Sequence, residues 1–125
     1  LGPERPELVL FPISITRFAA LEAVEHPDLA GSRIAVHHVR CLKPFRPSAA
    51  AIADLRASIF GGVVLDDDYP DGAAKAIAFD LAAATGRPMR VLGLADRTAG
   101  FAARVDNLPP SKEEIKNFIK ELCYP

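Results

Sequence analysis

The chain lacks several features that would indicate a function directly. Its 125 residues carry 15 basic and 16 acidic side chains, so there is no basic excess to attract nucleic acid or an anionic membrane. No apolar run approaches the ~20 residues that a membrane-spanning helix needs. Residues 1–6 are polar and proline-rich and lack the basic and apolar stretches of a signal peptide. We therefore expect neither nucleic acid nor a membrane as a partner.

Cysteine and the common catalytic motifs are also scarce. Cys41 and Cys123 lie far apart without metal-ligand spacing, and we interpret them as reduced thiols of a cytoplasmic protein. Gly61-Gly62 precedes a predicted strand, whereas a phosphate-binding glycine loop follows one. No serine lies in a Gly-x-Ser-x-Gly elbow. From these patterns we assign no catalytic, cofactor-binding or metal-binding residue.

What the chain does have is the composition and pattern of a single α/β domain. Hydrophobic residues make up 50% and charged residues 25%, which is ordinary for a globular chain of one domain. Strand-like and helix-like segments alternate from residue 1 to residue 125. We predict strands at 7–11, 33–40, 63–65 and 88–92, and helices from Ser14 or Thr16 to Glu25, at 48–60, at 71–86 and at 111–122. This order predicts a three-layer α/β fold with a mainly parallel sheet flanked by helices.

The spacing of apolar residues also predicts which face of each helix is buried. The expected buried residues of the first, second and last helices are Phe18, Leu21 and Val24; Ile52, Leu55 and Ile59; and Ile115, Phe118, Ile119 and Leu122. In the last helix, Lys112, Lys116 and Lys120 are expected to face solvent. Ser111 and Glu114 have the spacing of a capping box at its start.

Two groups of polar side chains invite a chemical interpretation. The three aspartates at 66–68 follow the third strand and have the oxygen ligands that Mg²⁺ prefers, but we favour a solvated turn in which Asp71 caps the next helix. His37 and His38 occupy adjacent strand positions, so their side chains point to opposite faces and cannot converge on one ligand. We expect hydrogen-bonded strand histidines there.

The third helix and the long loop after the fourth strand suggest an interface. The helix is rich in alanine and apolar nearly all round. Close packing on the sheet would explain this, but we favour contact with a second partner. The loop is long for a compact domain and is expected to contact something, with arginine and aromatic residues at the rim. The candidate interface residues are Ala74, Ala78, Arg97, Phe101 and Arg104.

Three sequence segments, taken in their order along the chain, resemble the C-terminal domain of the transketolase superfamily, and we call them the sequence landmarks. The first is the strand end and Leu-Lys-Pro turn of residues 39–44. The second is the hydrophobic strand with an acidic end at 63–67, and the third is the late strand with a glycine and then an aspartate at 91–97. Leu108-Pro109 before the last helix also fits. The turn at 68–72 is stiffer and more acidic than the glycine-rich turn common in that family.

The resemblance covers nearly the whole chain and implies a non-catalytic domain or subunit of a thiamine-diphosphate enzyme. It implies that thiamine diphosphate and Mg²⁺ bind to other domains or subunits, with which this chain forms a homodimer or a heteromer. Residues 92–97 look more like the branch that transfers two-carbon ketol groups. The alternative parent is the β subunit of a 2-oxoacid dehydrogenase. The alternative from another class is a stand-alone α/β module that binds a small ligand or a protein. Whether the chain is a separate subunit or an excised domain stays open.

Overall fold

The centre of the structure is a parallel sheet. The computed structural model describes residues 3–98 and 106–125. Within them, the strands are β1 (Leu8–Pro12), β2 (Ile34–Val36), β3 (Gly62–Leu65) and β4 (Met89–Leu92). They form one four-stranded sheet in the order β2-β1-β3-β4, and each neighbouring pair is parallel. The predicted parallel sheet is confirmed, although β2 is shorter than the expected strand.

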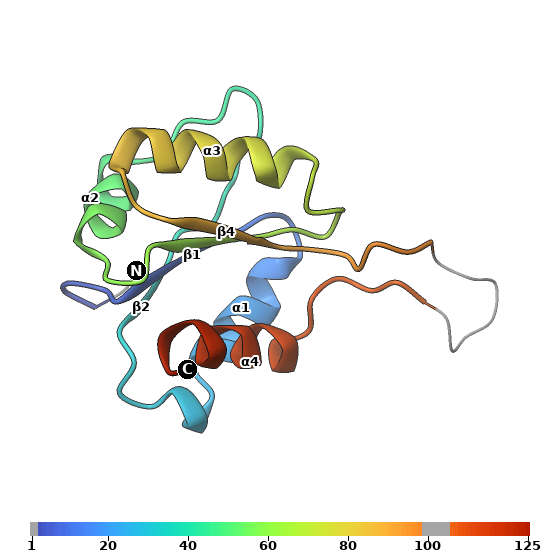
Figure 1. The fold of residues 1–125 in the computed structure, drawn as a ribbon, viewed down its shortest axis with the longest axis horizontal. Coiled ribbons are helices and arrows are strands. Elements are labelled where there is room, and N and C mark those ends of the chain that lie inside the picture. Colours follow the sequence, from blue (N-terminus) through green and yellow to red (C-terminus); the bar gives the residue numbers. More distant parts are fainter. Residues whose placement is uncertain (1–2, 99–105) are drawn as a thin grey trace.

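Helices cover both faces of the sheet, so the three-layer α/β fold is confirmed (Figure 1). Helices α2 (Ala49–Ala57) and α3 (Ala73–Thr85) lie on one face, and α1 (Thr16–Val24) and α4 (Lys112–Cys123) lie on the other. A short 3-10 helix, η1 (Pro27–Leu29), follows α1. Within residues 3–98 and 106–125, no helix has the length and apolar character needed to cross a membrane.

Alternation along the strands divides the core into two layers. Val9, Phe11 and Val64 face α2 and α3, whereas Leu8 and Leu10 face α1 and α4. None of these side chains is more than 2% exposed. Burial of each stabilises the fold by about 1.5–3 kcal/mol relative to an exposed side chain. Both faces of the central strands are therefore apolar, as expected for a sheet covered on both sides.

A glycine is required where the chain enters β3. Gly61 has a φ of +81°, and a Cβ atom built there would lie 2.0 Å from the carbonyl oxygen of Pro88. The backbone just before β4 therefore comes too close for any side chain at this position. The Gly61-Gly62 break seen in the sequence is the point where β3 comes alongside β4.

The buried face of α1 differs from the prediction. Phe18 and Leu21 are 56% and 47% exposed, whereas Ala20 and Ala23 are buried. The small alanine side chains let the helix approach the sheet and α4 closely. The Phe18 ring instead lies beneath the guanidinium group of Arg17, whose central carbon is 4.5 Å from the ring centroid. The prediction of buried residues was therefore wrong for Phe18 and Leu21, whereas Val24 is partly buried and packs against the core.

Three predicted caps can be compared with the structure. Neither Ser14 nor Thr16 caps α1; the buried Thr16 hydroxyl points to the carbonyl oxygens of Ile13 and Leu65, 2.6 and 3.1 Å away. Gly72, not Asp71, is the residue before α3, and it makes no side-chain cap. The capping box of α4 is confirmed, since the Ser111 amide donates to Glu114 and the Glu114 amide donates to the Ser111 hydroxyl.

Two further side chains lie where the spacing did not predict them. Ile59 is 61% exposed because α2 ends at Ala57, so Ile59 does not continue its buried face. Lys116 is only 8% exposed, although it was expected to face solvent. Its ammonium group pairs with Glu113 and lies 3.6 Å from Asp28 on η1. These two carboxylates compensate the positive charge, so the lysine side chain can lie along the protein surface.

Beyond β4 the chain forms an extended arm, which we define as residues 93–98 and 106–110. The arm projects from the body of the domain (Figure 1). Its two sides are joined by the Asn107 side chain, which accepts from the Ala95 amide and donates to the carbonyl oxygens of Ala95 and Arg97. The Arg97 guanidinium group donates to the Asp106 carbonyl oxygen over 2.9 Å. The described part of the predicted loop is therefore an organised pair of segments.

Candidate functional site

The three sequence landmarks meet at one edge of the sheet. Because all strands are parallel, their carboxyl ends lie together, at the edge where open α/β sheets bind ligands. Residues 39–44 follow β2, Asp66 and Asp67 follow β3, and residues 93–97 follow β4. The structure thus brings segments distant in sequence to a common surface.

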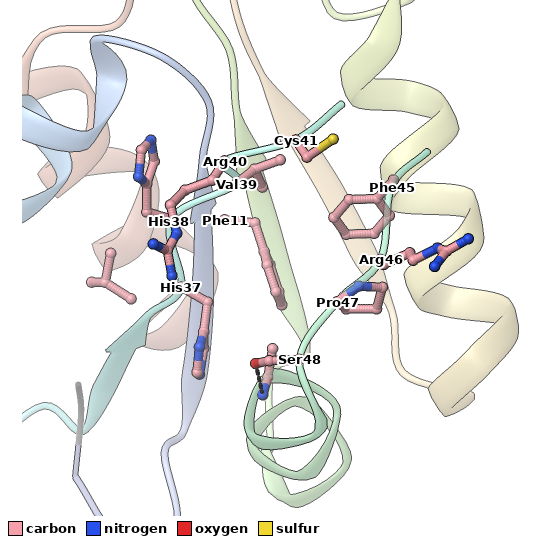
Figure 2. Close-up of a pocket in the computed structure, with 12 residues that line it drawn as sticks. Phe11, His37, His38, Val39, Arg40, Cys41, Phe45, Arg46, Pro47 and Ser48 are labelled. Atoms are coloured by element: carbon pink, nitrogen blue, oxygen red, sulfur yellow. Dashed lines mark hydrogen bonds between the residues drawn. The ribbon is translucent and has the colours of Figure 1, made fainter. Parts of the chain in front are cut away.

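A pocket of about 550 Å³ opens at this edge, and we call it the β2–α2 pocket (Figure 2). Its walls come from the end of β1, from the chain after β2 and from the first turn of α2. The lining residues are Phe11, residues 36–41, residues 45–48 and Ala51. The rings of Phe11 and Phe45 stand on two sides of it, with Cys41 and Ser48 at its other borders (Figure 2). The volume is in the range of small-ligand sites, roughly 300–1,000 Å³.

His37 is held in place beside this pocket. Its Nε2 atom lies 2.7 Å from Oδ2 of Asp54 on α2, and its ring stacks on Phe11 with centroids 6.1 Å apart. The expected hydrogen bond is therefore confirmed for His37, which lies just after β2, whereas the His38 side chain forms none within residues 3–98 and 106–125. Because Asp54 fixes one ring nitrogen, the imidazole has a defined orientation at the edge of the pocket.

His38 points away from His37, as alternation along a strand predicts (Figure 2). Burial lowers the pKa of His38, and the nearby positive charges of Arg17 and Arg40 lower it further. The environment of this side chain therefore disfavours an additional positive charge.

Cations at the mouth of the pocket are not neutralised by neighbours. Arg40 and Arg46 line the pocket, and Lys43 lies on the turn between them. All three are exposed, and none of them forms an ion pair within residues 3–98 and 106–125. The nearby carboxylate of Asp54 is already engaged by His37. A concave surface with charges of one sign attracts counter-charged solutes. The β2–α2 pocket therefore favours anions.

The aspartates after β3 do not all form a solvated turn. Asp66 is only 3% exposed, and Oδ1 accepts a hydrogen bond from the Asp68 amide over 3.3 Å. Burial raises the pKa of Asp66, and a hydrogen bond with Asp67 raises it further. The predicted solvated turn was thus wrong for Asp66 and holds for the exposed Asp68. Among the described residues, no group of three or more histidine, cysteine or acidic side chains could hold a metal ion.

The candidate interface residues fall into three groups. Ala74 and Ala78 are 0% and 7% exposed and pack in the core beneath α3, so they are not available to a partner in this structure. Their small size serves close packing on the sheet, and the outer side of α3 instead presents Phe79, which is 72% exposed. Arg97 lies exposed on the arm, as an interface would require. Phe101 and Arg104 lie outside the described residues.

Reasoning from the sequence missed most of the pocket. Phe11 was expected only to be part of a strand, and Phe45 and Asp54 were not singled out. The approach of Asp54 to His37 depends on how α2 sits over β1 and β2, which no local pattern encodes. The one available signal was the run of cations at Arg40, Lys43 and Arg46 after a strand.

Neither a model of a known protein family nor a curated protein matches this sequence. The family must therefore be inferred from the landmark residues and from where they lie in the fold.

Proposed function

We propose that this chain is the non-catalytic C-terminal domain, or an equivalent separate subunit, of a transketolase-like thiamine-diphosphate enzyme that transfers two-carbon ketol groups. The observation that carries the proposal is the arrangement of the three landmarks. Residues 39–44 follow β2, whereas residues 63–67 and 91–97 include the ends of β3 and β4, and the polar parts of all three segments share the carboxyl edge of one parallel sheet. Their order in sequence and their common edge are what the resemblance implies.

The role of the chain in this proposal is assembly, as a partner in a homodimer or a heteromer. The projecting arm supports it, because a pair of extended segments joined by Asn107 presents a defined surface away from the body. Leu108 on the arm is 70% exposed, and Arg97 is a further exposed residue of the arm. Exposed apolar and arginine side chains are the usual components of a protein interface.

Thiamine diphosphate and Mg²⁺ belong to the partner domains or subunits under this proposal. They would supply the carbanion chemistry there, while this chain supplies contact area. We also propose a cytoplasmic location, with which the free thiols of Cys41 and Cys123 are consistent. The same geometry suits the β subunit of a 2-oxoacid dehydrogenase, so substrate assays must separate the two parents.

Reconstitution tests the proposal directly. The purified chain is mixed with the thiamine-diphosphate-binding part encoded beside it, and both ketol transfer and 2-oxoacid decarboxylation are measured. We expect a stable complex and ketol transfer that neither part shows alone. Full ketol transfer without this chain would refute the proposal, and decarboxylation alone would point to the alternative parent.

A pair of matched variants tests the contact surface. Leu108→Asp places a charge on the arm, and Ile59→Asp places one at the opposite edge of the sheet, on a side chain 61% exposed. We expect Leu108→Asp to weaken assembly at least tenfold, since interface anchors commonly contribute about 2 kcal/mol or more. Ile59→Asp should change assembly by less than about twofold. Equal effects of the two variants would remove the arm from the interface.

A further inference from the structure

We propose that the β2–α2 pocket is a binding site for a small organic anion with a flat ring, such as an aromatic phosphate or carboxylate. The inference goes beyond the assembly role and does not depend on it. It rests on the shape of the pocket, on the chemistry of its walls and on the charge around its mouth.

The walls favour a flat apolar group. The rings of Phe11 and Phe45 stand on two sides of the cavity, and Pro47 and Ala51 complete its apolar lining (Figure 2). Phe11 is only 2% exposed, so it offers a ligand almost no surface and instead holds the His37 ring by stacking on it. The apolar surface that a ligand can reach belongs to the partly exposed Phe45 and Pro47. Aromatic rings bind other rings in offset or edge-to-face arrangements, which select flat ligands over branched ones.

The mouth favours negative charge. Arg40 and Arg46 flank the cavity at the two ends of the turn between β2 and α2. Figure 2 shows their side chains turned outward, and no carboxylate among residues 3–98 and 106–125 holds them there. Both are exposed and have long side chains, so they can turn toward a bound anion. A guanidinium group forms strong paired hydrogen bonds to phosphate and carboxylate.

A polar group with a fixed orientation also lines the pocket. His37 lines the pocket, and its Nε2 atom is committed to Asp54 at 2.7 Å. A pocket with apolar walls and a few fixed polar groups is the usual form of a small-molecule site. The cavity of about 550 Å³ accommodates a ring and one charged group together.

The experiment separates the contributions of ring and charge. Amide chemical shifts of the ¹⁵N-labelled chain are followed during titration with phenyl phosphate, with inorganic phosphate and with benzyl alcohol. We expect phenyl phosphate to shift the amides of His37, Cys41 and Ser48 and to bind at least tenfold more tightly than either fragment. Equal affinity for inorganic phosphate would show a charged surface without a ring site and would overturn the proposal.

Matched arginine variants test the recognition of charge. The double variant Arg40→Gln/Arg46→Gln should bind phenyl phosphate at least tenfold more weakly, because it removes both guanidinium groups and their charge-assisted contacts. Arg90→Gln is the control, because Arg90 is an exposed arginine on β4 that does not line the pocket. Circular dichroism confirms that each variant is folded. Unchanged affinity in the double variant, or shifts centred on Phe18 and Leu21 of α1, would refute the site.

Discussion

The orientation of α3 can be tested by two substitutions on one helix. Leu81 is fully buried against the sheet, whereas Phe79, two residues earlier, is 72% exposed. Residue size alone predicts that losing the larger phenylalanine costs more. The structure predicts the opposite, because only Leu81 contributes to the core.

The magnitudes follow from burial. Leu81→Ala removes a fully buried leucine side chain and should lower the free energy of unfolding by about 3 kcal/mol. That loss corresponds to a fall in Tm on the order of 10 °C for a domain of this size. Phe79→Ala removes an exposed ring from a helix, where alanine is the better helix former, and should change the stability by less than about 0.5 kcal/mol.

Urea unfolding followed by far-UV circular dichroism measures both values. Circular dichroism is the appropriate signal because the chain contains no tryptophan. The slope of the transition should be the same for both variants, so that the midpoints report stability alone. If Phe79→Ala destabilises the chain as much as Leu81→Ala does, then α3 is turned differently or Phe79 is covered in solution. Both explanations would contradict an α3 that buries Leu81 and exposes Phe79.

Three further predictions concern a cap, a thiol and a carboxyl group. Ser111→Ala should destabilise the fold by about 1 kcal/mol in urea unfolding, whereas Ser111→Thr should retain the cap. Burial raises the pKa of the Cys123 thiol to about 11, so a thiol reagent at pH 8 should modify the exposed Cys41 and spare Cys123 until the chain unfolds; equal rates would contradict its burial. Asp66 binds its proton more tightly in the folded chain, because its pKa is raised there, so its ionisation lowers stability as the pH rises above the ordinary value of 3.8. The unfolding free energy of Asp66→Asn, compared with that of the unsubstituted chain, should therefore be more favourable at pH 7 than at pH 3. A less favourable comparison at pH 7, measured by urea unfolding, would contradict the raised pKa.

The strands and their faces could be read from the sequence because alternation is a local property. Ala35 and Val39 face α2 and α3, while Ile34 and Val36 face the opposite layer, which is the alternation expected along a strand. The strand order could not be predicted in the same way. It depends on which apolar surfaces meet once the crossovers form, and the pairing of β1 with β3 joins segments far apart in the chain.

The errors on helix faces share a physical cause. Spacing assigns the largest apolar residues to the core, but α1 approaches its neighbours through Ala20 and Ala23 and leaves Phe18 outside. Lys116 was assigned to solvent by its charge, although Glu113 and Asp28 neutralise it in place. The packing of α1 is decided by neighbouring elements, whereas Lys116 is held by Glu113 of its own helix together with Asp28 of η1, a contact that the helix sequence alone does not encode.

The candidate site was less accessible to prediction than the fold. The aspartates at 66–68 and the cations at 40–46 were visible as runs of charge, but the β2–α2 pocket arises only when α2 brings Asp54 to His37. The local signals could indicate which edge of the sheet is polar. They could not indicate that two aromatic rings border a cavity there.

The position of α4 has a consequence for how the chain acquires its structure during synthesis. Leu8, Leu10 and Val63 emerge from the ribosome early, yet the helix that covers them with Ile115 and Ile119 is translated after all four strands. Until then one side of the nascent sheet has only α1 to shield it from water. A ribosome stalled before residue 112 should therefore hold a chain that binds chaperones, and release of the final helix should end that dependence.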